Sequence, residues 1–411
     1  TAEGQLLAIV ADTDAVEGAK KGDTVTLIFN QTPFYAESGG QVGDSGYLQA
    51  DSGKVEILDC RKSGEHHLHI GRVISGEIQS GQKVTAAVDS NVRQGTALNH
   101  SATHLMHAAL QQVLGDHVVQ KGSLVDSERL RFDFSHNHAV TPEQLRQIEH
   151  RVNREILRNS QVKTQVMSMD DAKTQGAMAL FGEKYGDTVR VVMMDPNYSI
   201  ELCGGTHIGG TGELGLFKLK HESAVAAGVR RIEAICGEGA NTQVNDALAE
   251  LETIKELVKN TKEPVKAVQQ MVAELQLLKK RIESYEALAL VGIKKELESK
   301  VSHIGDTHFI GAVVTVSNPD GLKKLCTALQ ENYTNLLVVL AANIDGKAFV
   351  AVLVDDTLQT SKGLEAQKII KDQIAPLIKG GGGGQKGLAT AGGQDSSNLT
   401  QVIENVKNLL K

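Results

Sequence analysis

Residues 99–110 read NHSATHLMHAAL and place His100 and His104 four positions apart. Apolar side chains recur around them with helical spacing, at Leu98, Leu105, Met106, Ala109 and Leu110. Residues four apart on a helix lie on one face in adjacent turns. The stretch therefore predicts a helix that packs through its apolar side chains and presents two imidazoles next to each other.

A second pair of metal-binding side chains follows in ELCGGTH, residues 201–207. Gly204 and Gly205 separate Cys203 from His207 and allow the tight turn that would bring a thiolate and an imidazole to one ion. Such ligands favour zinc over magnesium or calcium, which prefer oxygen. Each pair alone is weak evidence, because a helical HxxxH is often incidental and a lone cysteine usually lies in the core. Together they predict a Zn2+ site formed by His100, His104, Cys203 and His207.

The number of ligands leaves the role of the metal open. Four protein ligands complete a tetrahedral zinc, whereas a catalytic zinc normally keeps a position for water. Three arrangements would allow catalysis with four ligands. One ligand could be labile, or the ion could become five-coordinate. In the third arrangement, zinc would orient the substrate while another group activates water. His107, three residues after His104, is expected to be a satisfied surface histidine rather than a partner of a ligand.

The two metal-binding motifs lie within longer segments that resemble a known family. Residues 99–125, 199–219 and 228–237 resemble the editing domain of alanyl-tRNA synthetases and of their free-standing AlaX-type relatives. The glycine-rich segment TPFYAESGGQVGDSGYL, residues 32–48, is similar to part of the same domain, and IKGGGGGQKGLATAGG, residues 378–393, resembles the C-terminal DHHA1-type domain. No segment resembles the class II aminoacylation core, and the chain begins at Thr1. We therefore expect the C-terminal half of a bacterial-type synthetase, whose parent enzyme is an ATP-binding ligase.

The resemblance implies an aminoacyl-tRNA deacylase that hydrolyses mischarged Ser-tRNA(Ala) and Gly-tRNA(Ala) in protein biosynthesis. A synthetic site separates side chains that differ by one small group by only about 1–3 kcal/mol, so a second hydrolytic site is needed. By the same resemblance, Gln120 or Thr103 would bind the serine hydroxyl, and the loop of Ser38, Gly39, Gly40 and Gln41 would handle the substrate. Spacing alone favours a simple hairpin turn for that loop. The alternatives are a free-standing AlaX-type deacylase and a non-catalytic tRNA-docking module with structural zinc.

Composition is that of a multidomain protein of the cytoplasm. A length of 411 residues corresponds to two to four domains. No apolar run approaches the roughly 18 residues of a membrane span, and no secretory signal is visible, so no membrane partner is expected. The four cysteines are widely scattered, which argues against a disulfide framework.

The net charge of −7 requires that any tRNA contact come from local basic patches. Arg151, Arg154 and Arg158 share one face of a predicted helix and are one candidate, although a solvated helix face is equally consistent with them. The chain has no Trp and only 3% aromatic residues. Stacking along a single strand is therefore not the main mode of recognition, and shape and backbone contacts to a folded RNA fit better.

The expected fold is mixed α+β and multidomain. Short β segments separated by Gly, Asp and Ser predict a small β-barrel in residues 1–95. Residues 96–240 predict an α+β zinc editing domain, which includes a strand at 129–134 and a helix that begins after Thr141 and Pro142. Residues 241–300 predict a helical coiled-coil spacer, and residues 301–411 a C-terminal α/β globular domain that binds tRNA.

Apolar residues at heptad spacing mark the spacer. Val268, Leu275, Ile282 and Ala289 form one register, and Met271, Leu278 and Tyr285 the other. Pro264 should end the preceding helix, and Gly292 should break the seam. We expect an antiparallel hairpin. The alternative is a homodimer, which would form through residues 245–300 or through the C-terminal domain.

The C-terminal segment predicts the order strand, helix, strand, strand, helix, with the last helix reaching about Leu377. Five glycines follow, at Gly380, Gly381, Gly382, Gly383 and Gly384, before Lys386. They indicate either a flexible turn or a backbone-amide surface for RNA phosphate or sugar, and the two readings stay open. A DHH phosphoesterase is excluded, because its Asp-His-His block has no match in this chain.

Overall fold

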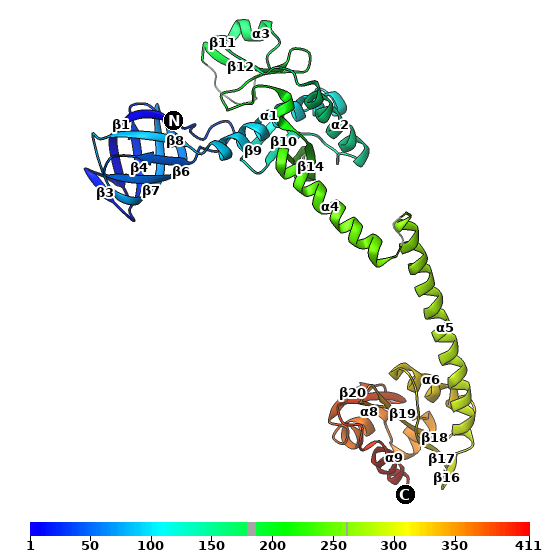
Figure 1. Ribbon diagram of the computed structural model, residues 1–411. Helices are drawn as coiled ribbons and strands as arrows, with labels where there is room; N and C mark the ends of the chain where they lie inside the picture. Colours follow the sequence, from blue (N-terminus) through cyan, green and yellow to red (C-terminus); the bar gives the residue numbers. More distant parts are fainter. Residues whose placement is uncertain (179–185, 260–261) are drawn as a thin grey trace. The chain divides into compact units, whose positions relative to one another are not determined.

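The computed structural model describes residues 1–178, 186–259 and 262–411. The chain is mixed α+β and multidomain, as predicted, and divides into two compact units, Thr1–Thr253 and Ile254–Lys411. Figure 1 shows the β-rich N-terminal part of the first unit in blue. Throughout the described part of the chain, each helix is too short or too polar to cross a bilayer.

The N-terminal strands form the predicted small barrel. Six of these strands form a closed barrel in the order β1, β4, β7, β6, β5, β8, with β8 paired again to β1. Strand β2 also pairs with β1, and strand β3 pairs with β7. Inward side chains such as Leu6, Leu27 and Ile57 alternate with exposed ones and form its core. The strands are β1 (Ala2–Ala11), β2 (Asp14–Val16), β3 (Gly18–Lys20), β4 (Thr24–Phe29), β5 (Gly46–Gln49), β6 (Gly53–Ser63), β7 (His66–Gln79) and β8 (Lys83–Val88).

Strand β7, with the sequence HHLHIGRVISGEIQ, places one polar side chain at a buried position of the barrel. This residue is His69, which is fully buried. Its Nε2 lies 2.7 Å from Thr32 Oγ1 and its Nδ1 lies 3.1 Å from the Leu27 carbonyl oxygen. Burial lowers the pKa of His69 to about 4, so the ring is neutral in the folded barrel.

The zinc-motif region of the first unit is built from two small sheets and two principal helices. Helix α1 packs on the sheet β14-β15-β10-β9, and a second sheet has the order β11-β12-β13. Its elements are α1 (Ser90–Leu114), β9 (Gln120–Val125), β10 (Leu130–Ser135), α2 (Pro142–Arg158), β11 (Lys163–Ser168), α3 (Met169–Thr174), β12 (Thr188–Asp195), β13 (Ser199–Leu202), η1 (Thr211–Leu214), β14 (Phe217–Ala226) and β15 (Val229–Cys236). The predicted helix start at Thr141 and Pro142 is confirmed, with a capping box between Thr141 and Gln144.

Helix α1 is buried on every side along residues 99–110. Leu105, Met106 and Leu110 are fully buried in one core with Phe132 and Phe134 of β10. A helix surrounded in this way cannot rotate or slide without opening the core. The side chains that it presents are therefore held in fixed positions.

Two long helices follow, α4 (Gly237–Leu257) and α5 (Pro264–Glu298). Helix α5 continues through Gly292, the position at which the apolar seam is predicted to break. A glycine inside a helix costs about 1 kcal/mol relative to alanine, and here Leu290, Ile293 and Leu297 pack against the core of the second unit and offset that cost. The seam side chains Met271, Leu278 and Ile282 are exposed. Their pairing in a hairpin or a homodimer stays a prediction.

The second unit contains one sheet of order β16-β17-β18-β19-β21-β20, covered by helices (Figure 1). The predicted order strand, helix, strand, strand is present, with β17 and β18 parallel. The expected single helix to Leu377 is instead divided, because Gly363 adopts a left-handed conformation after α7. The elements are β16 (Ser302–Ile304), β17 (Thr307–Val313), α6 (Pro319–Gln330), β18 (Leu336–Ile344), β19 (Lys347–Val354), α7 (Asp356–Lys362), α8 (Ala366–Ile369), η2 (Ile370–Ile374), β20 (Gly380–Gly384), β21 (Leu388–Gly393), α9 (Leu399–Lys407) and η3 (Asn408–Leu410).

The five glycines form β20, an edge strand paired with β21, so the flexible-turn interpretation is wrong. A Cβ atom at Gly380 would lie 2.0 Å from the Gly392 carbonyl oxygen, and one at Gly382 would lie 2.2 Å from that of Thr390. Side chains at these positions would therefore push the two strands apart. The strand is exposed along its length, and its use as an RNA surface stays a prediction.

We predict that acidification destabilises the barrel through His69. The unfolded chain gains a proton on this residue below pH 6.5, whereas the folded chain gains it only near pH 4. Stability is therefore lost as the pH falls from about 6.5 to about 4, by at most about 3 kcal/mol for this residue. Urea unfolding at pH 7.5 and 4.5 should show a smaller pH effect in His69→Gln than in wild type. The exposed His66→Gln is the control, and an unchanged pH effect in His69→Gln would contradict the prediction.

Candidate metal centre

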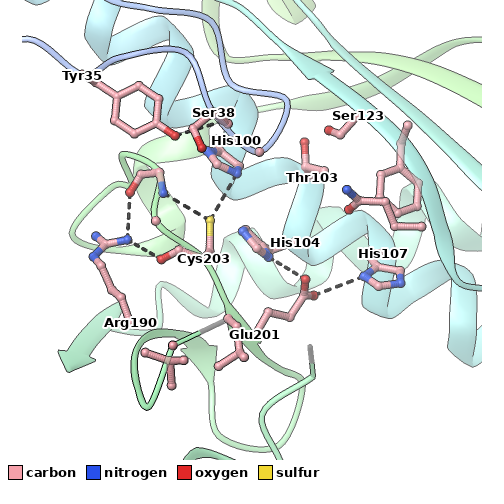
Figure 2. Close-up of a pocket in the computed structure, with 18 of the residues that line it drawn as sticks. Tyr35, Ser38, His100, Thr103, His104, His107, Ser123, Arg190, Glu201 and Cys203 are labelled. Carbon is pink, nitrogen blue, oxygen red and sulfur yellow. Dashed lines mark hydrogen bonds and ion pairs between the residues drawn. The ribbon is translucent and has the colours of Figure 1, made fainter. Parts of the chain in front are cut away.

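The structure brings the four predicted ligands to one place. Helix α1 presents His100 and His104, whose stacked rings have centroids 5.3 Å apart. Figure 2 shows these two rings beside Cys203. The turn after β13 presents Cys203 together with His207. Their ligand atoms all lie within 4.8 Å of one another. Cys203 Sγ lies 3.4 Å from His100 Nε2 and 3.3 Å from His207 Nε2.

This close approach requires a glycine at position 205, whereas Gly204 has open space around it. A Cβ atom at Gly205 would lie 2.2 Å from His100 Cε1 and 2.6 Å from Gln41 Oε1. The turn is also held from outside, because Arg190 of β12 donates hydrogen bonds to the carbonyl oxygens of Cys203 and Gly205, at 2.7 and 2.8 Å. Any larger residue at Gly205 would displace a ligand.

Each histidine contacts a different partner through Nδ1. His100 Nδ1 lies 2.7 Å from Gln41 Oε1, His104 Nδ1 lies 2.8 Å from Glu201 Oε2, and His207 Nδ1 lies 3.1 Å from Ser101 Oγ. Such contacts orient a ligand ring. The oxygens of Gln41 and Glu201 only accept, so they place a proton on Nδ1 of His100 and His104. The Nε2 atoms of His100 and His207 both lie near Cys203 Sγ, at the centre of the cluster.

The surroundings of His104 indicate that the cluster fits a metal ion. Its Nε2 is buried and has no hydrogen-bond partner among the described residues. Leaving such a nitrogen unpaired is costly, and a metal ion at the centre of the cluster would satisfy it. Three imidazoles and one thiolate at these separations are a donor set suited to zinc. The residues present therefore fit the predicted ion.

The electrostatics of the cluster favour a cation. Burial alone would raise the pKa of the Cys203 thiol, but His100 and His104 outweigh burial and lower it well below its usual value, which favours the thiolate. Burial also opposes ionisation of Glu201, yet His104 lowers the pKa of this carboxyl. For His207 burial dominates and lowers the pKa to about 3, so the ring is neutral and able to ligate.

The pKa of His104 also indicates that the cluster favours positive charge. Burial lowers its pKa, but Glu201 and Cys203 together outweigh burial and raise it to about 10. In the absence of a metal, this ring holds a proton between two buried anions. A dication at the centre would supply the positive charge in place of that proton.

A cavity of about 280 Å³ adjoins the ligands. Thr103 of α1 and Gln120 of β9 line it, as do Ser38 and Gly39 of the glycine-rich loop. The other two residues of that loop do not line the cavity. Gly40 packs on Ser123, and Gln41 is buried. Sequence reasoning thus placed these residues at one site, while their individual roles stay predictions.

Several site residues were missed by the sequence analysis. Glu201 lies two positions before Cys203, and an acidic residue between Ile200 and Leu202 was the available signal. Arg190 also belongs to the site, although the sequence around it gives no comparable indication. Tyr35 and Ser123 belong to it as well, and both lie within segments that carry the family resemblance. The expected surface position of His107 is wrong, because its side chain is 2% exposed and its Nδ1 lies 3.4 Å from Glu201 Oε1. Helix α1 is buried on that face as well.

The predicted basic patch lies on α2, apart from the residues that line the cavity. Arg151 donates to Gln112 at 3.0 Å, while Arg158 pairs with the buried Glu155 at 2.7 Å and Arg154 approaches it at 3.8 Å. The Arg154 and Arg158 side chains are 52% exposed. In the second unit, Lys386 pairs with Glu365 at 3.2 Å. The tRNA contacts of these residues stay predictions.

Comparison with known proteins gives three family matches. Residues 1–92 match tRNA synthetases class II (A), residues 189–233 match the threonyl and alanyl tRNA synthetase second additional domain, and residues 306–411 match the DHHA1 domain. A solved structure, the C-Ala domain from Aquifex aeolicus alanyl-tRNA synthetase, is 23% identical over 27% of this chain and 96% of its own, with a TM-score of 0.25.

Curated relatives match along nearly the whole chain. Alanine–tRNA ligase of Saccharophagus degradans is 43% identical over 100% of this chain and 47% of its own length. That of Cytophaga hutchinsonii is 43% identical over 95% and 44%, and that of Pseudomonas entomophila 42% over 98% and 46%. The chain spans about half the length of these relatives. With its second additional domain and its DHHA1 domain, the chain belongs to the alanyl-tRNA synthetase family.

Proposed function

We propose that this chain is the editing and tRNA-binding part of an alanyl-tRNA synthetase and hydrolyses mischarged Ser-tRNA(Ala) and Gly-tRNA(Ala) at a zinc site. The observation that carries the proposal is the cluster of His100, His104, Cys203 and His207 beside a cavity. The match of residues 189–233 to the second additional domain supports it. A parent ligase that activates alanine with ATP is part of the same proposal.

The size and polarity of the cavity suit the acylated 3′ end of a tRNA that carries a small amino acid. Zinc, when bound, would polarise the ester carbonyl or orient the ester. The chain's own residues would do the rest. Thr103, Gln120 and Ser123 offer polar side chains around the amino acid, and Tyr35 and Ser38 lie on the loop side of the cavity.

Selection against correct Ala-tRNA would depend on the serine hydroxyl. Thr103 Oγ1 donates its own proton to the Asn99 carbonyl oxygen at 2.9 Å, so its lone pairs are left to accept. The Gln120 amide can both accept and donate. A substrate hydroxyl in this cavity could thus donate a hydrogen bond to Thr103, and it could either donate to or accept from the Gln120 amide. A methyl group could form neither of these hydrogen bonds.

The second unit would bind the tRNA, consistent with its DHHA1 match. The exposed glycine strand β20 and Lys386 are its candidate surface for the RNA backbone, and the arginines of α2 are the candidate in the first unit. A free-standing deacylase and a docking module with structural zinc are the alternatives. Pairing of two chains through the exposed seam of α5 would give a homodimer.

The first prediction from this site concerns the metal. The purified chain should hold one zinc, and Cys203→Ala should weaken zinc binding by roughly two orders of magnitude, because the thiolate is a direct ligand. Metal analysis after gentle purification measures the first, and chelator competition the second. Cys326→Ala, which removes a buried cysteine of the second unit, should keep full zinc. Zinc at the level of a contaminant in wild type would contradict the assigned site.

The second prediction tests the activity. The zinc-loaded chain should deacylate Ser-tRNA(Ala) and Gly-tRNA(Ala) and spare Ala-tRNA(Ala). Gln120→Ala should lower kcat/KM for the seryl substrate roughly three- to tenfold, the value of one hydrogen bond, and should leave the glycyl substrate, which has no hydroxyl, nearly unchanged. Full zinc and tRNA binding without deacylation would select the docking-module alternative.

The third prediction concerns the second unit. A chain truncated after Leu257 retains the whole first unit and α4. Because tethering through a second contact raises the local concentration of the acylated end, truncation should raise KM for Ser-tRNA(Ala) roughly tenfold or more. The single-turnover rate at saturation should change little. Equal efficiency of the two chains at low tRNA concentration would assign the second unit another role, such as dimerisation.

A further inference from the structure

The glycine-rich loop of the barrel reaches the metal ligands through Gln41, which is 1% exposed. Gln41 Oε1 lies 2.9 Å from the backbone nitrogen of Thr206 and 2.7 Å from His100 Nδ1, and its Nε2 donates to Thr206 Oγ1 at 3.0 Å. One side chain thus contacts both segments that carry the ligands, helix α1 and the turn after β13. The whole amide is used in these contacts.

These contacts fix the state of His100. A backbone N–H can only donate, so the Gln41 atom that faces Thr206 must be the oxygen. The same oxygen faces His100 Nδ1 and can only accept, so the proton of the neutral ring lies on Nδ1. His100 Nε2 is then unprotonated and lies 3.4 Å from Cys203 Sγ, in the form that binds a metal.

The backbone of the loop is joined to the zinc-motif region. Val42 N donates to the Val125 carbonyl oxygen at 3.1 Å, and Val125 N donates to that of Gly40 at 2.8 Å. A Cβ atom at Gly40 would lie 2.6 Å from the Ser123 carbonyl oxygen, so only glycine allows this approach. Gln41 is therefore held in place from both sides, by β9 and by the ligand turn.

We propose that Gln41 is a positioning residue of the metal centre, so that zinc binding and docking of the barrel loop on the zinc-motif region are coupled. The inference rests on the proposed zinc site and assigns Gln41 to the metal rather than to the substrate. Zinc binding should order the loop, and the docked loop should strengthen zinc binding by the same factor, since coupling is reciprocal. Loss of a residue that orients a ligand typically costs 10- to 100-fold in metal affinity.

The test is the affinity of the full-length chain for Zn2+, measured by competition with a chelator of known affinity. Gln41→Ala should raise the Kd roughly 10- to 100-fold. Gln41→Glu keeps an acceptor for His100 and for the Thr206 N–H, and should stay within a few-fold of wild type. Gln120→Ala removes a glutamine that lines the cavity but makes none of these contacts; it is the matched control and should bind zinc as wild type does.

Hydrogen exchange of the amides of residues 38–42 gives a second readout. In wild type, Zn2+ should slow their exchange relative to the chelator-treated chain, and in Gln41→Ala this protection should be lost at equal zinc occupancy. An unchanged Kd in Gln41→Ala, or equal losses in the alanine and glutamate variants, would overturn the proposal. Circular dichroism melting of the metal-free variants shows whether a weaker Kd only reflects misfolding, which would also overturn it. Wild type without zinc would instead refute the metal site itself.

Discussion

Three imidazoles that present the same nitrogen to one point are the constraint on which the first unit depends. Each ring is held through Nδ1 by a residue from a different element: Gln41 from the barrel loop, Glu201 from β13 and Ser101 from α1. A histidine that turned over would replace a lone pair with a proton at the centre. The site therefore needs the barrel, the buried helix and the small sheet together.

Charge balance explains why these partners differ. Cys203 and Glu201 are both driven to their anionic forms inside the protein. Two buried anions are costly unless compensated. A dication would neutralise both of these charges. Gln41 and Ser101, the partners of the other two rings, are neutral and add no charge to the centre.

The parts of this site that follow local rules could be predicted from the sequence. Helical spacing predicted that His100 and His104 share a face, and glycines predicted the turn between Cys203 and His207. The partners of these ligands could not be predicted in the same way, because Gln41 and His100 meet only after the barrel loop docks. Packing also supports α5 beyond Gly292, where Leu297 and its neighbours contact the core of the second unit. The same limit applies to the glycine strand β20, whose extended form depends on its pairing with β21.

The proposed activity divides recognition between the two units. A cavity of about 280 Å³ can read a small side chain through Thr103 and Gln120, but it offers too little surface to identify an RNA. At a net charge of −7, the chain as a whole has no general attraction for phosphate. Selection of tRNA must then come from local surfaces, of which β20 presents bare backbone and α2 presents arginines. The two parts of the substrate would thus be recognised by different interactions. Hydrogen bonds inside the cavity would distinguish the wrong amino acid from the correct one, and contacts to the RNA backbone would select the tRNA.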